Sequence, residues 1–510
     1  MEKKDISRKR VSIVNLLFNY ANTLFYIVNG LVLVPIYLNH FSIATYGSYL
    51  SSGNIVGMLG FLDAGMNLVF TQKLSVSYVK KNLEDFTKIL GAGFFISIIL
   101  TALLILIALG LLPFISDWVK AEPSEYKNLQ YAFLLSAVAA GLTISFQNIS
   151  AVFQAWLKVQ ICGYANLISI IIGISSTLIG LKFGLGVVSI PLGFFMKSIT
   201  GLIILVLSLI NILRINKYPK IKIEKYYCLD LLKSSLPVLG GNISKSLINN
   251  CQLLIITSFI NPASTAIFVI TGKVYQVCGT FLAPIGSSIY SSVSQLVGEG
   301  NIQKTKESII RVFILFTVFS AIILSSSLAL NSAFISLWVG PDKYGGITLS
   351  MLLCINIFLS MRFNFIDINL YALGLFGKTV LYDQISAIMR ILLIFTLINR
   401  IGFIAIPISE FLSITFLSGY LLNKLIIKKL NLNHKEAIQF IFSGTLVVSL
   451  SFILAFIWQF YFTNALNWKI FISQSILFFS ITALTSIIIT KDTRNILFNL
   501  INYNKLKRIQ

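Results

Sequence analysis

Charged side chains are scarce in this chain. Only 11% of its 510 residues are Asp, Glu, Lys or Arg, whereas 56% are hydrophobic. Soluble domains carry about 25% charged residues, so this composition excludes a soluble protein. The apolar residues form runs of roughly 20 or more, the length of a membrane-crossing helix and about twice that of a strand in an outer-membrane barrel. The sequence therefore predicts an all-α polytopic membrane protein.

The residues that usually build catalytic and metal centres are also rare. The five cysteines lie apart from one another without CxxC spacing, and the two histidines, His40 and His434, fall in predicted loops. Isolated cysteines in apolar runs behave as small hydrophobic residues. The patterns of a phosphate-binding loop, of a zinc-binding HExxH helix and of a GxSxG nucleophile do not occur in the sequence. We expect no structural disulfide, no metal, no cofactor and no enzymatic activity.

Hydropathy predicts about fourteen membrane-spanning helices. Six of them lie near residues 11–37, 44–71, 89–116, 128–155, 160–182 and 186–213. Six more lie near 234–260, 264–296, 308–338, 346–373, 377–399 and 402–427, and a final pair lies near 436–462 and 466–490. Merging the weakly separated pair within 160–213 would change this count.

Acidic residues are outnumbered, since 18 Asp and Glu face 40 Lys and Arg and leave a net charge of +22. Most of the basic residues fall in segments that the predicted spans place on one side, including 1–10, 73–88, 214–233, 304–311, 424–435 and 491–508. The positive-inside rule then predicts that both ends are cytoplasmic. A basic inner surface favours anionic membrane lipid as a partner. No basic patch with interleaved aromatic residues accompanies the charge, so we exclude nucleic acid as a partner.

A faint internal repeat divides the chain. Four residues of the first predicted outer turn have counterparts in a later turn: Asn39, Ser42, Ala44 and Tyr46 match Asn261, Ser264, Ala266 and Phe268. Both halves begin on the cytoplasmic side, so they are parallel repeats, which place a substrate site between them near the middle of the membrane. We predict a six-helix lobe at 1–225, a second at 226–430, and two additional helices with a basic tail at 431–510, with a central cavity between the lobes.

Nine ionisable residues remain inside the predicted spans. They are Asp63, Lys197, Lys245, Lys273, Arg362, Asp367, Asp383, Arg390 and Glu410. A charge in hydrocarbon is costly, so each must face protein or a water-filled cavity and is a candidate for function. Asp63 and Glu410 are candidates for proton or cation coupling, although a carboxylate held by neighbouring helices explains either residue equally well.

Two polar stripes strengthen the prediction of a cavity. In the first span of the second half, polar residues recur at helical spacing: Asn242, Lys245, Asn249 and Gln252. The first span of the chain has the same pattern, with Asn15, Asn19, Asn22, Tyr26 and Asn29. Lys273 and Gln276 lie one turn apart in the next span of the second half. We interpret these residues as lining an aqueous cavity; the alternative is polar contact between packed helices.

The remaining basic residues have two interpretations. Arg362 and Arg390 lie near the middle of their spans, where an arginine can hold a phosphate through a bidentate fork. Structural ion pairs of Arg390 with Asp367, or of Arg362 with Asp383, are the alternative. Lys197 is a further candidate for the cavity.

The chain resembles the polysaccharide flippases of the multidrug/oligosaccharidyl-lipid/polysaccharide exporter superfamily, and within it the O-antigen and capsule repeat-unit flippases. The resemblance rests on Pro35 near the first helix exit, Tyr46-Gly47, the sequence Leu62-Asp63-Ala64-Gly65 and the basic loop at Lys80-Lys81, together with the predicted arrangement of spans. It implies two six-helix lobes around a cationic cavity.

The resemblance also implies a function and partners. The expected substrate is an oligosaccharide linked to undecaprenyl pyrophosphate, moved from the inner to the outer leaflet of the bacterial cytoplasmic membrane by alternating access. Polysaccharide-assembly proteins and a coupling cation, H⁺ or Na⁺, are further expected partners. The alternatives are a flippase for lipid II or another polyprenyl-linked precursor, and a cation-coupled multidrug exporter. Span one contains no lysine or arginine between residues 11 and 37, a departure that disfavours lipid II.

Overall fold

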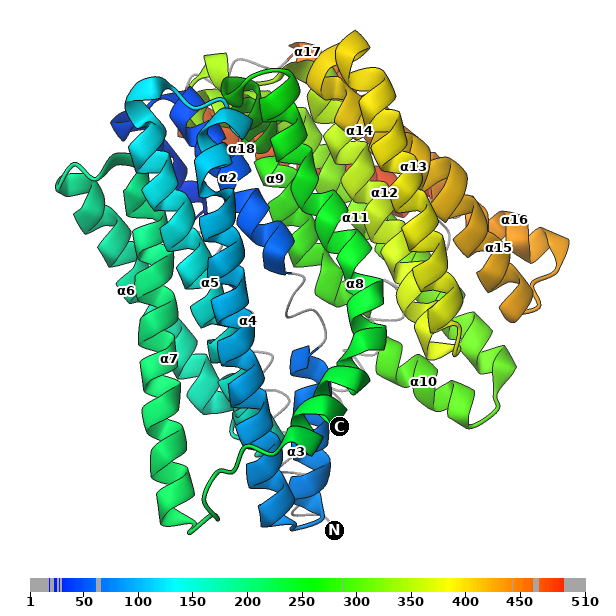
Figure 1. The fold of residues 1–510 in the computed structure, drawn as a ribbon. Helices are drawn as coiled ribbons and strands as arrows, with labels where there is room; N and C mark the ends of the chain where they lie inside the picture. Colours follow the sequence, from blue (N-terminus) through cyan, green and yellow to red (C-terminus); the bar gives the residue numbers. More distant parts are fainter. Residues whose placement is uncertain are drawn as a thin grey trace. The chain divides into compact units, whose positions relative to one another are not determined.

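The computed structural model describes residues 18, 23–24, 27, 30–60, 66–287, 289–442, 444–461 and 467–489. Throughout these ranges the regular elements are helices (Figure 1). The chain divides into two compact units, Met1–Ala266 (unit 1) and Ile267–Gln510 (unit 2). The prediction of an all-α polytopic membrane protein is confirmed.

Unit 1 is built from long helices joined by short turns. A helix at Gly30–His40 precedes α2 (Ile43–Leu59), α3 (Met66–Val79), α4 (Leu83–Trp118), α5 (Tyr126–Ala155), α6 (Val159–Lys182), α7 (Ser189–Ile215) and α8 (Lys225–Phe259). Short 3₁₀ turns, η2 (Pro123–Glu125) and η3 (Gly186–Val188), lead into α5 and α7.

Polar side chains determine where two of these helices begin. Ser42 Oγ accepts a hydrogen bond from the Thr45 amide at 3.0 Å, and Asn82 Oδ1 accepts one from the Asp85 amide at 3.1 Å. Such caps satisfy backbone donors that have no partner in the first helical turn. Helix α4 therefore begins at Leu83, earlier than the predicted residue 89, because its first turn is polar and hydropathy does not detect it.

Glycines allow α6 and α7 to pack closely, side by side in Figure 1. A Cβ atom at Gly193 would overlap Thr177 Oγ1, and one at Gly173 would lie 2.8 Å from the Gly193 carbonyl oxygen. Small residues at such contacts let the backbones of membrane helices approach one another. This close approach fixes the position of the α7 residues that follow Gly193.

Unit 2 comprises most of α9 (Pro262–Ser287) and the helices that follow it. These are α10 (Tyr290–Gly298), α11 (Ile302–Trp338), α12 (Gly346–Ala372), α13 (Phe376–Ile401), α14 (Ala405–Ser413), a π-helical segment (Ile414–Gly419), α15 (Tyr420–Lys429), α16 (His434–Ile441), α17 (Thr445–Tyr461) and α18 (Trp468–Ile489). Helix α11 forms the centre of the unit, packed against α12, α17 and α18. Its buried Phe313 stacks on Phe440 with ring centroids 4.4 Å apart.

Ten helical stretches of the described chain are long and apolar enough to cross a membrane. They include separate helices at Val159–Lys182 and Gly186–Ile215, so the weakly separated pair predicted at 160–213 is two spans. The spans predicted at 377–399 and 402–427 correspond to α13 and to the segment from α14 to α15. Gly402, at φ +63°, ends α13, and α14 packs against α13, so the chain turns back here although the turn Gly402–Ile404 is itself helical. Most of the first predicted span and residues 61–65 of the second lie outside the described residues.

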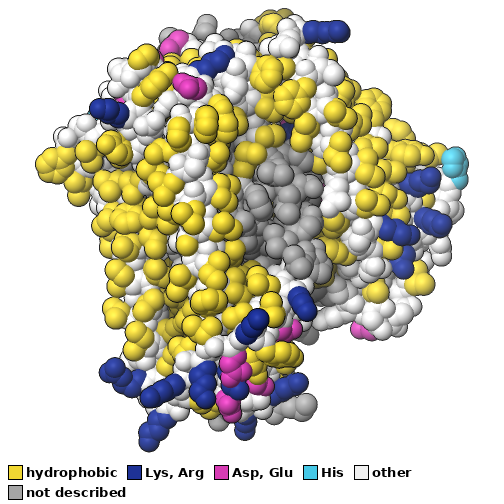
Figure 2. Space-filling model, in the orientation of Figure 1, with side chains coloured by type: hydrophobic (Ala, Val, Ile, Leu, Met, Phe, Trp, Pro, Cys, Tyr) yellow, Lys and Arg dark blue, Asp and Glu magenta, His cyan; other side chains and the backbone are white. Residues whose placement is uncertain are grey.

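The surface of unit 1 has the polarity of a membrane protein. Large apolar side chains such as Ile98, Leu106 and Leu207 are more than half exposed, and Figure 2 shows hydrophobic side chains covering the flank of the long helices. Lysine and arginine side chains gather at one end, where Lys217, Lys220 and Lys222 are exposed. An apolar band that ends in basic residues is typical of a helical bundle in contact with lipid.

Helix α8 begins at Lys225, ahead of its predicted start at 234, and packs within unit 1 against α2, α3 and α4. The predicted lobes at 1–225 and 226–430 and the additional pair at 431–510 stay predictions.

Candidate functional site

The structure describes the predicted site residues to different extents. Asn22, Asn29 and Asp63 lie outside the described residues. Asn242, Lys245 and Asn249 belong to helix α8, of which only the backbone is described at these positions. Gln252, one turn further along α8, is half-buried.

A polar seam joins α8 to α2 within unit 1, one position along from the predicted stripe. Asn54 Nδ2 donates to the Asn250 carbonyl at 3.2 Å, and Ser246 Oγ donates to the Gly57 carbonyl at 3.4 Å. Ser51 donates to the Leu253 carbonyl at 3.1 Å and also hydrogen-bonds Thr257. These hydrogen bonds are polar contacts between packed helices. Polar contact of this kind is the alternative interpretation given above for the neighbouring stripe of Asn242, Lys245, Asn249 and Gln252. Serine and threonine on a helix rarely identify such a contact from sequence, because they also bond their own backbone.

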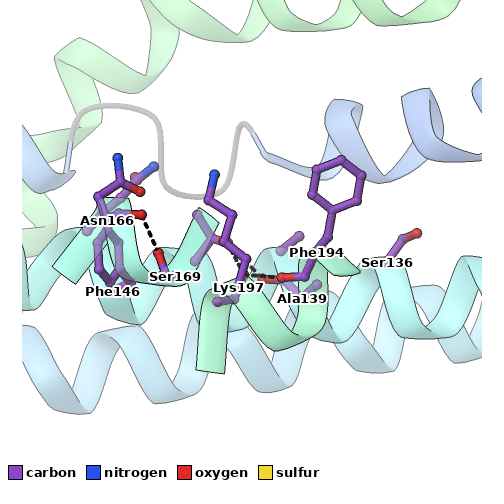
Figure 3. A pocket seen from close by; sticks show the side chains of 11 residues that line it. Ser136, Ala139, Phe146, Asn166, Ser169, Phe194 and Lys197 are labelled. Carbon is purple, nitrogen blue, oxygen red and sulfur yellow. Dashed lines mark hydrogen bonds between the residues drawn. The ribbon is translucent and has the colours of Figure 1, made fainter. Parts of the chain in front are cut away.

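Lys197 lines a pocket of about 400 Å³ within unit 1. Helices α5, α6 and α7 form its wall, which consists of Ser136, Ala139, Ala140, Thr143, Phe146, Gln147, Asn166, Ser169, Phe194, Lys197 and Ser198. Figure 3 shows Asn166, Lys197 and Phe194 pointing to the same side of these helices. We call this the Lys197 pocket.

The packing of the helices holds Lys197 at this position. A Cβ atom at Gly173 of α6 would lie 3.0 Å from the Lys197 Cβ, so the absence of a side chain there makes room for the lysine stem. One residue further along α7, Ser198 hydrogen-bonds Thr143 of α5 at 2.9 Å. The lysine is therefore fixed from both sides while its ammonium extends into the pocket (Figure 3).

The polar groups of the Lys197 pocket fall into two kinds. The hydroxyls of Ser169 and Ser198 donate to the carbonyls of Asn166 and Phe194, at 2.8 and 2.9 Å. Within the described residues, by contrast, the ammonium of Lys197 and the side-chain amides of Asn166 and Gln147 have no hydrogen bond or ion pair. Among the described residues these three groups are left for a ligand, and none of the described lining residues is an aspartate or a glutamate.

In unit 2, Arg390 and Glu410 form an ion pair. The Arg390 Nη2 and Glu410 Oε2 atoms are 2.7 Å apart, and the two side chains are 10% and 21% exposed. Arg390 comes from α13 and Glu410 from α14, directly before the π-helical segment Ile414–Gly419. The sequence offered Asp367 as the partner of Arg390, but Arg390 pairs with Glu410, the residue predicted for ion coupling. Asp367 accepts a hydrogen bond from the Tyr371 hydroxyl at 2.6 Å.

Arg362 is buried in the core of unit 2. Its guanidinium donates to the backbone carbonyls of Phe440 and Ile441 and lies 4.8 Å from the centre of the Phe313 ring. Because carbonyl acceptors at the end of a helix attract a cation, this arginine joins α12 to the end of α16. On α9, Lys273 is half-buried and Gln276 is exposed.

Ion pairs that the sequence analysis did not find hold the start of α8 against α3 and α4. Lys73 of α3 pairs with Asp230 at 2.5 Å, and Lys88 of α4 lies 3.1 Å from Glu224. Tyr227 donates to Asp85, and this hydrogen bond raises the pKa of Tyr227 to about 12, so the phenol stays protonated at neutral pH. Partners this far apart in sequence leave no local pattern.

Comparisons with known proteins place the fold. Residues 12–297 match the family model described as "Polysaccharide biosynthesis protein". No curated protein sequence matches the chain. Among solved structures, the lipid II flippase MurJ in an inward closed conformation is similar, with a TM-score of 0.68 and 13% identity over 93% of this chain and 99% of that one. An inward-facing multidrug resistance transporter of the MATE family, in the MOP superfamily, has a TM-score of 0.65 and 13% identity over 82% of this chain and 98% of that one.

Proposed function

The chain belongs to the polysaccharide biosynthesis protein family, and from this premise we propose that it is a flippase for a lipid-linked oligosaccharide. Its substrate is an oligosaccharide repeat unit joined to a polyprenyl, specifically undecaprenyl, pyrophosphate. The protein moves this headgroup from the inner to the outer leaflet of the bacterial cytoplasmic membrane by alternating access, with both of its own ends in the cytoplasm.

The observation that carries this proposal is the Lys197 pocket. An ammonium and two side-chain amides without partners among the described residues line a space of about 400 Å³ inside a bundle of membrane helices. Groups of this kind are expensive in lipid and mark the path of a polar substrate. Amides and hydroxyls hydrogen-bond sugars, and a lysine attracts an anion. The polyprenyl chain needs no such groups, because it stays in the hydrocarbon.

Energy coupling belongs to the same proposal. A cation, H⁺ or Na⁺, would act on a carboxylate within the membrane, and Glu410 and Asp63 are the candidates. The described Glu410 pairs with Arg390 at 2.7 Å, so a proton or cation would have to compete with that arginine. Arg390 and Arg362 are held by protein groups in unit 2. Of the described lysines that remain, Lys197 and Lys273, Lys197 lines the pocket described above and is our first candidate for the cation that meets the substrate.

Lipid II is the second candidate substrate. The observation in its favour is the similarity of the fold to the lipid II flippase MurJ, which extends over 93% of this chain. At 13% identity this similarity concerns the fold alone, and a MATE transporter has almost the same TM-score. The lack of any lysine or arginine between residues 11 and 37 argues against lipid II, and the family match favours an oligosaccharide.

Complementation separates these candidates. The chain is expressed at a matched membrane level in a strain that lacks its oligosaccharide flippase and in a strain depleted of its lipid II flippase. We expect the first strain to regain surface polysaccharide and to lose the lipid-linked precursor trapped inside, and the second strain to stay arrested. Rescue of the second strain alone would assign lipid II, and dye efflux without rescue of either strain would assign a multidrug exporter.

A further inference from the structure

We propose that the Lys197 pocket is a subsite for one acidic sugar, a hexose that carries a carboxylate. This inference rests on the proposed function and deepens it, because it states that the translocated oligosaccharide contains such a sugar. Its evidence comes from the charge, the hydrogen-bonding groups and the size of the pocket, taken one at a time.

The charge of the pocket points to an anionic ligand. Lys197 is the one ionisable residue among the eleven that line the pocket, and all of these residues belong to the described part of the chain. A buried carboxylate beside the ammonium would make the pocket neutral and suited to an uncharged sugar. The described lining residues include no such carboxylate, and an ammonium half-buried within a membrane span then gains most from a ligand that brings a negative charge.

The hydrogen-bonding groups point to a sugar. The amides of Asn166 and Gln147 each offer both a donor and an acceptor, which is what a ring bearing several hydroxyls requires. Phe146 and Phe194 supply apolar surface beside these amides. This mixture differs from the wall of a site for a small inorganic anion, in which donors predominate.

The size of the pocket points to one sugar residue. Its volume of about 400 Å³ lies near the lower end of the range of roughly 300–1,000 Å³ for sites that hold small molecules. A whole repeat unit would extend beyond it, so the pocket selects one residue of the headgroup.

A carboxylate suits the pocket better than the diphosphate of the carrier. A diphosphate carries several charges on many oxygens and is usually held by arginine forks or by more than one cation. The eleven described lining residues offer one ammonium and no arginine. One point charge and two amides match one carboxylate and its neighbouring hydroxyls.

Binding by the full-length protein in lipid nanodiscs tests the inference. The probes are galacturonic and glucuronic acid, galactose and glucose, and inorganic pyrophosphate, and the readout is saturation-transfer NMR with titration. The variants are Lys197→Met and Asn166→Ala. The matched control is Lys182→Met, since Lys182 is an exposed lysine at the end of α6 in the same unit.

We expect a hexuronate to bind, and Lys197→Met to weaken its binding about tenfold or more, because it removes one charge-assisted hydrogen bond. Asn166→Ala should weaken it less, and Lys182→Met should leave it unchanged. Neutral hexoses should bind at least about tenfold more weakly than the hexuronate. The inference is overturned if pyrophosphate binds with the same dependence on Lys197, if neutral hexoses bind as well as the acids, or if Lys197→Met has no effect while the protein stays folded.

A second measurement distinguishes this failure from a failure of the proposed function. Cells that lack their own flippase are supplied with a repeat unit that contains a uronic acid or with one that is neutral. We expect Lys197→Met to slow export of the acidic repeat unit several-fold more than that of the neutral one. If the wild-type chain exports neither, the proposed function fails whatever the binding result; if it exports both and Lys197→Met changes neither, the acidic-sugar subsite fails alone.

Discussion

At the scale of single residues, the ion pair of Arg390 and Glu410 shows how an intramembrane charge is stabilised in this protein. Each side chain alone would be a charge largely removed from water, which costs several kcal/mol. Together, at 2.7 Å, they offset each other's desolvation. The pair therefore contributes to stability only as long as both members are present.

We predict that removing one member destabilises the protein more than removing both. Arg390→Met leaves Glu410 uncompensated and should lower the free energy of unfolding by about 3–5 kcal/mol. The double variant Arg390→Met/Glu410→Met should recover much of this loss, because no unpaired charge remains. Thermal unfolding of the purified protein in detergent gives the comparison. If the loss of unfolding free energy in the double variant equals the sum of the losses in the two single variants, the two side chains act independently.

Single residues also mark the limit of prediction from sequence. The sequence identified Arg362, Arg390 and Glu410 as charges that need partners, because hydropathy shows that they lie within apolar runs. It could not identify the partners, since Arg390 meets a residue on another helix and Arg362 meets two backbone carbonyls that carry no sequence signal. Lys197 was named as a candidate, yet its pocket depends on Asn166 and Thr143 from two other helices.

At the scale of helices, the contact of α6 with α7 positions the pocket. Gly173 and Gly193 let the two backbones approach, and Lys197 follows Gly193 by one turn. In the sequence these two glycines do not differ from other glycines of membrane helices. Their role in the close packing of α6 and α7 depends on which residues of the other helix they contact, and the sequence does not give those contacts.

We predict that Gly193→Ala strains this contact. The added methyl would overlap Thr177 Oγ1 and approach the Gly173 carbonyl oxygen to 2.7 Å, and overpacking of this kind costs about 1–3 kcal/mol. The expected result is a lower unfolding temperature and weaker hexuronate binding. Gly110→Ala on α4 is the matched control, because the added methyl would meet no neighbouring side chain or helix within 4 Å and alanine favours a helix. An equal stability of both variants would show that the α6–α7 contact tolerates a wider spacing.

At the scale of the whole molecule, hydropathy predicted the all-helical membrane fold, whereas the cytoplasmic position of both ends, predicted from the basic residues, stays a prediction. The thickness of the hydrocarbon core acts on every span, and each span therefore shows in the sequence as a long apolar run. Helix ends were less predictable: α4 and α8 begin earlier than expected because their first turns are polar. The seam between α2 and α8 was missed because its hydrogen bonds come from serine, threonine and asparagine, which are common on membrane helices for other reasons.

Transport by the purified chain tests the central claim most directly. The protein is reconstituted in liposomes loaded on one leaflet with a polyprenyl-pyrophosphate-linked oligosaccharide, and a glycosidase in the outer solution reports each headgroup that arrives there. We predict that the wild-type chain delivers headgroups to the enzyme, and that Lys197→Met slows delivery of a headgroup containing a hexuronate. The control is protein-free liposomes with the same cation gradient imposed. If liposomes that contain the folded wild-type chain expose no more headgroup than this control, the claim that the protein is a flippase for lipid-linked oligosaccharides is contradicted.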